Sequence, residues 1–288
     1  MLDIGNVFSN TFNMMKERWL ALLGLWAVFF GLLIVYALIA FAVLGGAATA
    51  MMGGISDPSA ASLGSMGIGI IIMGVIFYIG YFAIAFGQQG SMVAMASPLK
   101  RISFGDALGI GIKGGLTFLG VLVLLLIAYV AFAIIAVILG FILSFLGEAA
   151  AVILAILILP AIIYLLCRFA VLVPVIVVER IFNPITAITR CWAVTRGHVL
   201  GILVVIIITV VIAAIMIGVP FMLFFGALFA TADPANFNAG SAIGGAVFGM
   251  LIFFLMYLLY MIFSASLIAS LHAQISDADT VDLGKTFE

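Results

Sequence analysis

Six long apolar runs constrain this chain more than any other feature of its sequence. They occupy residues 19–44, 64–96, 115–146, 149–178, 199–230 and 242–272. Each run exceeds the roughly 20 residues that an α-helix needs to cross a hydrocarbon core of about 30 Å. The segments between them are short and more polar, with a very tight turn at Gly147-Glu148. The pattern predicts six transmembrane helices.

The composition agrees with this prediction and excludes a soluble domain. Of the 288 residues, 67% are hydrophobic and 7% are charged, with a mean hydropathy of +1.49. A soluble domain is about half apolar and a quarter charged. Membrane β-barrels show short segments of alternating polarity, whereas these runs are continuous. We therefore expect an all-α, polytopic membrane protein in which residues 1–288 form a single membrane domain.

The distribution of basic residues predicts the orientation of the chain. Nine of the ten Lys and Arg residues flank the runs on one side of the membrane: Lys16, Arg18, Lys100, Arg101, Lys113, Arg180, Arg190, Arg196 and Lys285. The three opposite loops contain Asp57, Glu148 and Asp233 but no basic residue. Because basic loops stay on the cytoplasmic side, both termini are expected to face the cytoplasm.

Residues 183–201 predict a short amphipathic helix at the membrane surface. Asn183 is a good N-cap, and Pro184 follows at the first helical position. Ile185, Ile188 and Trp192 then fall on one face. Gly197 can end the helix. Such a helix is expected to lie in the membrane interface.

Two other segments, 6–24 and 103–120, resemble this one in length and in their mixture of small, polar and apolar residues. Each of the three precedes an apolar run. We therefore expect the six transmembrane helices to form three hairpins, each preceded by a short interfacial amphipathic helix. The likeness could also be convergent, since any interfacial helix has this character. The possible repeat units are 1–97, 98–178 and 179–288.

One charge, Arg168, interrupts the fourth run and is the basic residue that the orientation rule leaves unexplained. An arginine at mid-bilayer costs about 2.5–3.5 kcal/mol on insertion scales. Three arrangements lower this cost. The helix can end near residue 167, with Pro174 marking a break, or a longer helix can let the side chain reach the interface. In the third, Arg168 points into the bundle and meets Gln88, Glu179 or a bound anion.

Polar residues near Arg168 suggest a cavity that opens to the cytoplasm. Gln88 holds the position in the second unit that corresponds to Arg168. Five basic or amide groups near the headgroup level would suit an anionic lipid headgroup or a phosphate. Against this, positive-inside topology alone places arginines there, and amides hydrogen-bond between packed helices. The candidate residues for a ligand or lipid headgroup are Arg168, Gln88, Gln89, Glu179, Arg190 and Arg196.

No pattern of catalytic or metal-binding residues stands out. Gly109, Gly111 and Gly114 spell G-x-G-x-x-G, but no strand precedes them, so close helix packing explains them better than a nucleotide site. His198 and His272 lack a second ligand at metal spacing. We expect no catalytic residue, no metal and no cofactor, and we predict that the chain is not an enzyme. It has no basic tail that would predict nucleic-acid binding.

Small residues in the last run predict close approach of helices. Glycines spaced by four let two backbones pack tightly in a membrane. Internal packing is the default interpretation of these glycines, and a homo-oligomer interface is the alternative. They are Gly240, Gly244, Gly245 and Gly249.

The segment FAVLVPVIVVERIFNPITAITRCWAVTRG at residues 169–197 resembles the prokaryotic glycerophosphoryl diester phosphodiesterase membrane-domain family and related six-span proteins. Residues 87–113 also look like the family's segment after its second span. Within these 288 residues nothing resembles the catalytic domain of that family, so the resemblance implies a fold and no hydrolase activity. Cys191 replaces the usual Ser of the motif. The matching positions are Arg168, Pro174, Glu179, Arg190-Cys191-Trp192 and Thr195-Arg196-Gly197.

Two functional hypotheses follow. The first is a non-enzymatic protein of the prokaryotic cytoplasmic (inner) membrane that works through membrane lipids, anionic ones included, through a membrane-protein partner or as a homo-oligomer. It would serve in scaffolding, assembly or envelope homeostasis. The alternative is a transporter or channel for a lipid or small anion, through a cytoplasm-facing cavity around Arg168. Against transport, the first, third and fifth runs carry almost no polar residues.

Overall fold

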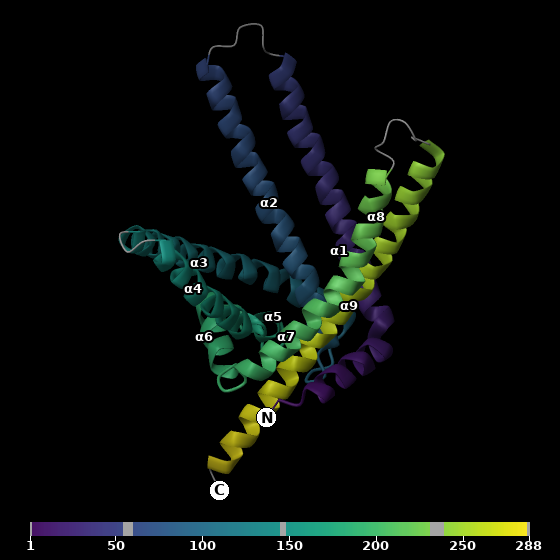
Figure 1. Cartoon of the computed structure of the whole chain (residues 1–288). Coiled ribbons are helices and arrows are strands. Elements are labelled where there is room, and N and C mark those ends of the chain that lie inside the picture. Colours follow the sequence, from purple (N-terminus) through teal and green to yellow (C-terminus); the bar gives the residue numbers. More distant parts are fainter. Residues whose placement is uncertain (1, 54–59, 145–147, 231–238, 287–288) are drawn as a thin grey trace.

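The computed structural model describes residues 2–53, 60–144, 148–230 and 239–286 (Figure 1). The predicted loop residues Asp57, Gly147 and Asp233 lie outside these ranges. Within them the chain is helical and contains no strand. The helices are α1 (Ile4–Gly53), α2 (Ala60–Ala96), α3 (Phe104–Ser144), α4 (Glu148–Phe169), α5 (Leu172–Val177), α6 (Pro184–Val194), α7 (Val199–Ala213), a π-helical turn η1 (Ala214–Gly218), α8 (Val219–Ala230) and α9 (Ala239–Thr286).

The prediction of six transmembrane helices is confirmed. Six helical segments of the described chain are long and apolar enough to cross a membrane: Ile4–Gly46, Ile71–Ala96, Phe104–Phe141, Ile158–Val177, Val199–Gly226 and Gly244–Ser276. The chain is therefore an all-α, multi-pass integral membrane protein. Several helices exceed the required length, and the 41 residues of α3 rise about 62 Å at 1.5 Å per residue.

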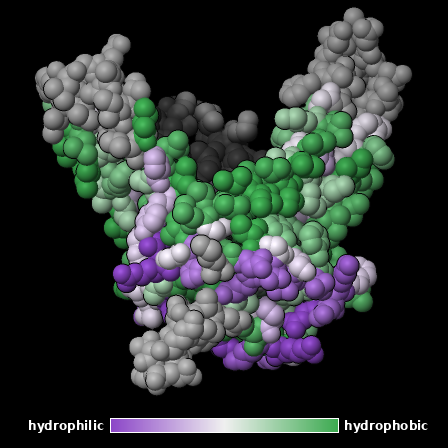
Figure 2. Space-filling view, turned by 60° about the horizontal axis from the view of Figure 1, so that its bottom comes forward, coloured by the Kyte–Doolittle hydropathy of each residue, from purple (hydrophilic) through white to green (hydrophobic). Residues whose placement is uncertain are grey.

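The helices form three hairpins that diverge from a common base. Figure 1 shows α1 with α2, α3 with α4, and α8 with α9 running side by side and then separating as three groups. We call the base the hub; it comprises residues 4–30, 88–121, 167–205 and 262–276, where the buried core lies. We call the rest of the hairpins the arms. Hydrophilic residues gather at the hub end, and hydrophobic residues cover the described parts of the arms (Figure 2).

The first predicted interfacial helix is present as the beginning of α1. The backbone leaves the helical region at Arg18, with φ of −125° and ψ of 15°, so the residues before it form a separate helix at an angle to the arm. The Arg18 guanidinium donates hydrogen bonds to the carbonyls of Met95 and, at 3.4 Å, of Ser97. These carbonyls lie at the end of α2, where no helical N–H is available to them. The kink thus allows Arg18 of α1 to cap the C-terminal end of α2.

The second predicted interfacial helix does not form a separate element. Residues 104–144 are one continuous helix, α3, so the segment 103–120 is simply the hub half of the third span. Ser103 caps its start by accepting a hydrogen bond from the Asp106 N–H at 3.1 Å, but the helix does not end before the span begins. The small residues of this segment allow close contact with another helix. A Cβ atom at Gly111 would overlap the Ser91 hydroxyl and one at Gly115 would overlap the Ala83 carbonyl, so α3 packs closely against α2.

The third predicted interfacial helix, α6, forms as expected. The Asn183 side chain accepts hydrogen bonds from the backbone N–H groups of Ile185 at 3.0 Å and Thr186 at 3.3 Å. The helix ends at Val194, and Gly197 adopts φ of +85°, a conformation that favours glycine. Ala187, Cys191 and Val194 face the hub. The opposite face, with Ile185 and Trp192, is exposed.

The fourth run is broken just after Arg168. Proline lacks an N–H, and its ring clashes with the carbonyl four residues earlier. For Pro174 that residue is Ala170, which lies in the turn between α4 and α5. This is the first of the three predicted arrangements, with the helix ending two residues later than expected. The short helix α5 then enters the centre of the hub, and Leu172, Val175 and Ile176 are buried.

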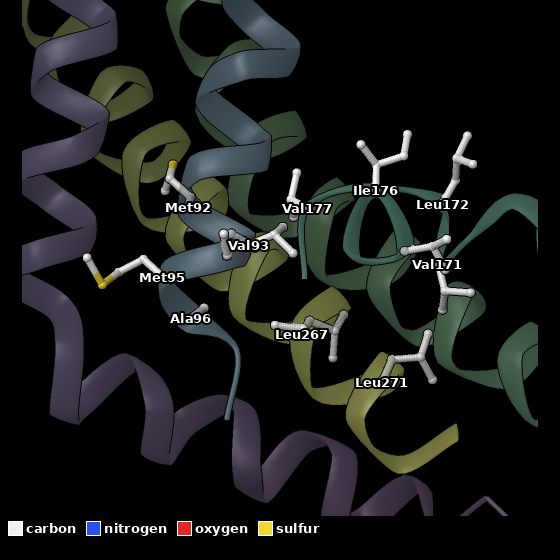
Figure 3. Packing of buried hydrophobic residues seen from close by; sticks show 14 of the residues in the cluster. Met92, Val93, Met95, Ala96, Val171, Leu172, Ile176, Val177, Leu267 and Leu271 are labelled. Carbon is white, nitrogen blue, oxygen red and sulfur yellow. The ribbon is translucent and has the colours of Figure 1, made fainter. Parts of the chain in front are cut away.

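Figure 3 shows how α5 completes the core. Its apolar side chains lie beside those of α2 and α9, and α3 and α6 also contact it. A six-residue helix thereby reaches four of the other helices. The labelled residues of this cluster are Leu172, Ile176 and Val177 of α5 and, around it, Met92, Val93, Met95, Ala96, Val171, Leu267 and Leu271.

The first and last spans are also joined at the hub. The Ser270 hydroxyl donates a hydrogen bond to the Val7 carbonyl at 2.9 Å, across 263 residues of sequence. In the arm of α9, a Cβ atom at Gly249 would lie 3.0 Å from the Cα of Phe224, which supports the prediction of close packing there. Gly244 has open space around it, and Gly245 lies in the same helix. Gly240 belongs to α9, but its surroundings lie outside the described residues.

Candidate functional site

Arg168 lies in the last turn of α4, where the chain turns into the hub. Tyr164 precedes it by four residues and therefore shares its helix face. Arg168 is 8% exposed, so its charge is removed from solvent and from lipid. Such a group is tolerated only where the protein supplies partners.

The guanidinium finds its partners on α4 and α6. Nε and Nη2 donate hydrogen bonds to the Tyr164 hydroxyl oxygen at 2.9 and 2.6 Å. Nη1 donates to the Trp192 carbonyl at 3.0 Å and to the Thr195 Oγ1 at 3.3 Å. In the other direction, the Cys191 thiol donates to the Arg168 carbonyl at 3.0 Å. Arg168 thus fastens the end of the fourth span to the interfacial helix.

Two aromatic rings enclose the same charge. The guanidinium carbon lies 5.0 Å from the centre of the Tyr164 ring and 4.8 Å from that of Trp192. A cation over an aromatic face contributes about 1–2 kcal/mol when desolvated. Among the described residues, no carboxylate forms an ion pair with Arg168. The rings and the hydrogen bonds hold the charge in place.

A second polar cluster surrounds Glu179, which follows α5. Its Oε2 accepts a hydrogen bond from Arg190 Nε of α6 at 2.8 Å. Its Oε1 lies 3.0 Å from His272 Nε2 of α9, and the Ser276 hydroxyl lies 3.2 Å from the same nitrogen. Since an ionised carboxylate only accepts, the bond to Glu179 requires the proton on Nε2. This cluster ties α5, α6 and α9 together.

The electrostatics of this cluster favour the ionised form of Glu179. Burial alone raises the pKa of a carboxyl group, but the hydrogen bonds and charges of His272 and Arg190 outweigh it, so the pKa of Glu179 lies below its ordinary value. Burial raises the pKa of the Cys191 thiol to about 12, with only partial opposition from its hydrogen bonding and from Arg168. Cys191 is therefore an unreactive structural thiol.

In the described part of the chain, the predicted ligand residues lie in different surroundings. Glu179 and Arg190 are brought together, as described. Arg196 is exposed in the turn after α6. Gln88 is buried on α2 and borders an apolar pocket in the arm. Gln89 is half-buried, and its Oε1 has no hydrogen-bond partner.

The partners that complete both clusters were not singled out from the sequence. Tyr164 could have been found, since it precedes Arg168 by one helical turn. The sequence pattern drew attention to His272 only as a histidine without a second metal ligand, and 93 residues separate it from Glu179. Thr195 and the Trp192 carbonyl reach Arg168 only because the chain reverses after α4. No local spacing signals such contacts.

The contacts of Arg168 and Glu179 join α4, α5, α6 and α9 to one another. In the described ranges, no group of three or more His, Cys, Asp or Glu side chains could hold a metal ion. Comparison with known protein families, with curated proteins and with solved structures finds no match. The resemblance to the phosphodiesterase membrane-domain family therefore stays a prediction.

Proposed function

We propose that this chain is a non-enzymatic scaffold of the prokaryotic inner membrane that holds lipids and a membrane-protein partner between its arms. The observation that carries the proposal is the divergence of three hairpins from one hub (Figure 1). Within a bilayer, the spaces between diverging helices are filled by lipid or by other helices, because empty volume forfeits dispersion contacts. The arms offer surfaces for such partners.

The use of the polar groups supports the same proposal. Arg168, Arg18 and Glu179 are engaged with other parts of the hub. Transport through a cavity around Arg168 would require this side chain to meet a ligand, and its 8% exposure and four hydrogen bonds offer no support for that role. We therefore keep the scaffold as the single proposal. In it the hub end faces the cytoplasm, following the distribution of basic residues.

Photo-crosslinking in cells tests the scaffold. A photoreactive amino acid is placed at three strongly exposed arm positions, Phe41 of α1, Val137 of α3 and Met222 of α8. Leu200, which is equally exposed but lies in the hub at the start of α7, serves as the control. We expect a discrete protein adduct of constant mass from at least one arm and not from Leu200. Adducts with lipid alone at all three arms would overturn the proposal.

A further inference from the structure

A pocket of about 680 Å³ lies between α1, α2 and α9. Its walls are contributed mainly by the arms of α1 and α2. None of its lining residues is charged, and most are aromatic or aliphatic. At the hub end, the Trp26 ring stacks on Phe30 with centroids 4.7 Å apart. The size is within the range of about 300–1,000 Å³ that is typical of small-molecule sites.

Gln88 is the one amide among the residues that line this pocket. It is 5% exposed, and no described residue forms a hydrogen bond with its side chain. Burying an amide without a partner is unfavourable, and such groups normally have protein or ligand partners. The Tyr36 hydroxyl, which also borders the pocket, already donates to the Phe77 carbonyl at 2.9 Å. Gln88 is therefore a buried polar group that an occupant of the pocket can bond, in addition to the hydroxyls of Tyr78, Tyr81 and Tyr257 in the lining.

The position of the pocket limits what the occupant can be. Its α1 wall runs from Trp26 to Leu44 and its α2 wall from Gly74 to Gln88, within the first two candidate spans. Water would find few polar partners along such walls. The α1 wall is about 27 Å long at 1.5 Å per residue, and a partner helix about 10 Å wide over that length would need roughly 2,000 Å³. That exceeds the volume available, whereas a single acyl chain is much thinner.

We propose that this pocket binds an uncharged single-chain lipid, with its acyl chain along the aromatic wall and its ester or hydroxyl group on the Gln88 amide. The absence of charge in the lining disfavours a phosphate or carboxylate at this depth. The inference deepens the lipid part of the proposed function and rests on it. It concerns a defined site within the membrane rather than general contact with the bilayer.

The test uses monoolein carrying a diazirine in its chain, with the purified full chain in nanodiscs. Crosslinked residues are mapped by mass spectrometry, and affinity is measured by competition with unlabelled monoolein. We expect crosslinks on Phe30, Phe41 and Phe77, which line the pocket. Gln88→Leu removes the amide and should weaken binding about tenfold, as expected for one or two lost hydrogen bonds.

Two matched controls separate the pocket from general effects. Gln89→Leu makes the same change one residue further along α2, at a side chain that does not line the pocket. Gly74→Leu fills the pocket, since a Cβ there meets nothing within 4 Å, and Gly31→Leu adds the same group in similarly open space outside the lining. Binding should fall to background in Gly74→Leu and stay unchanged in Gln89→Leu and Gly31→Leu.

Several outcomes would overturn the inference. One is equal affinity of Gln88→Leu and the wild type, and another is labelling spread evenly over all six spans. Preference for oleate over monoolein would replace the uncharged ligand with an anionic one. The scaffold proposal has a separate readout, the protein adducts formed in cells. If those adducts form while monoolein fails to bind, this inference alone fails; if monoolein binds and the adducts are absent, the scaffold alone fails.

Discussion

The hub and the arms belong to the same helices, and they differ in what surrounds their side chains. In the hub, Leu22, Leu25 and Ile176 are completely buried. In the arms, Phe41 and Val137 are 79% and 72% exposed. Lipid tails are as apolar as these side chains, so a bilayer gives little reason for the arms to close on one another. The arms must therefore be held in position by the hub, where the buried core lies.

The hub contains specific contacts between its helices. It contains the close α2–α3 contact, the enclosed arginine and the carboxylate cluster. Each depends on geometry rather than on apolar area, and each joins segments that are distant in the sequence. The specific structure of this protein is therefore determined at one end. The directions of the arms depend on how their helices are packed in the hub.

The largest effect is expected where two backbones touch. In Gly115→Leu, the added Cβ would overlap the Ala83 carbonyl on α2, which cannot move aside as a side chain could. We expect a loss of more than about 3 kcal/mol in the free energy of unfolding, or failure to accumulate. The midpoint of thermal unfolding in detergent measures it. Gly109→Leu, with open space around the same atom, is the control and should unfold near the wild-type temperature.

The next largest effect is expected at Arg168. Arg168→Met keeps the unbranched stem of the side chain but removes the guanidinium, which leaves Tyr164, Thr195 and the Trp192 carbonyl without their donor. We expect a loss of about 2–4 kcal/mol, from the hydrogen bonds and the two ring contacts. Arg168→Lys should recover only part, since lysine has no planar fork. Equal stability of Arg168→Met and the exposed control Arg196→Met would show that Arg168 does not fasten the hub.

A smaller effect, dependent on pH, is expected at Glu179. Its pKa in the folded state lies below the ordinary value of 4.5. The stabilisation is therefore complete above pH 4.5 and is lost as the pH falls through the lower, folded-state pKa. Glu179→Gln should cost about 1–2 kcal/mol at neutral pH, and the difference from the wild type should shrink in acid.

Thermal unfolding across a pH series measures this difference. The exposed Glu17→Gln provides the matched control, for which we expect no comparable dependence. A gap between Glu179→Gln and the wild type that stays constant below pH 4.5 would contradict the role given to the carboxylate.

The smallest effect is expected in the arms. Ile138 of α3 is 53% exposed, and Ile138→Ala removes apolar surface that already faces the surroundings. The change in the free energy of unfolding should stay within about 0.5 kcal/mol. A cost of 2 kcal/mol or more, in the range of about 2–5 kcal/mol for truncation of a buried isoleucine, would mean that the arms are packed as tightly as the hub.

The sequence predicts the elements of this fold better than their connections. The length of the apolar runs predicts the six spans, and the Asn183 cap predicts α6. Both signals are contained within one continuous segment of the sequence. The break after Arg168 was one of three open arrangements, and the proline signal favoured it only in part. The sequence did not predict that α3 would be continuous, because its small residues suit both a surface helix and a close helix contact.

The candidate site was harder to predict for the same reason. Arg168 was recognised because a lone charge in an apolar run is conspicuous. Its partners, and the pairing of Glu179 with His272, depend on how α4, α6 and α9 meet in space. The possible repeat placed Gln88 at the position that corresponds to Arg168. In the structure, Gln88 instead lines the apolar pocket between α1, α2 and α9.

The hydrogen bond from Ser270 to the Val7 carbonyl has a consequence for biosynthesis. The helix that contains Val7 is synthesised well before the hydroxyl that bonds to it, which follows 263 residues later. Until the last span is inserted, the beginning of the chain lacks this contact, and the Val7 carbonyl is bonded only by local donors such as Thr11. A chain truncated before the last span would therefore lack this hydrogen bond and would keep only the contacts of its first helix with earlier elements, such as that of Arg18 with the Met95 carbonyl.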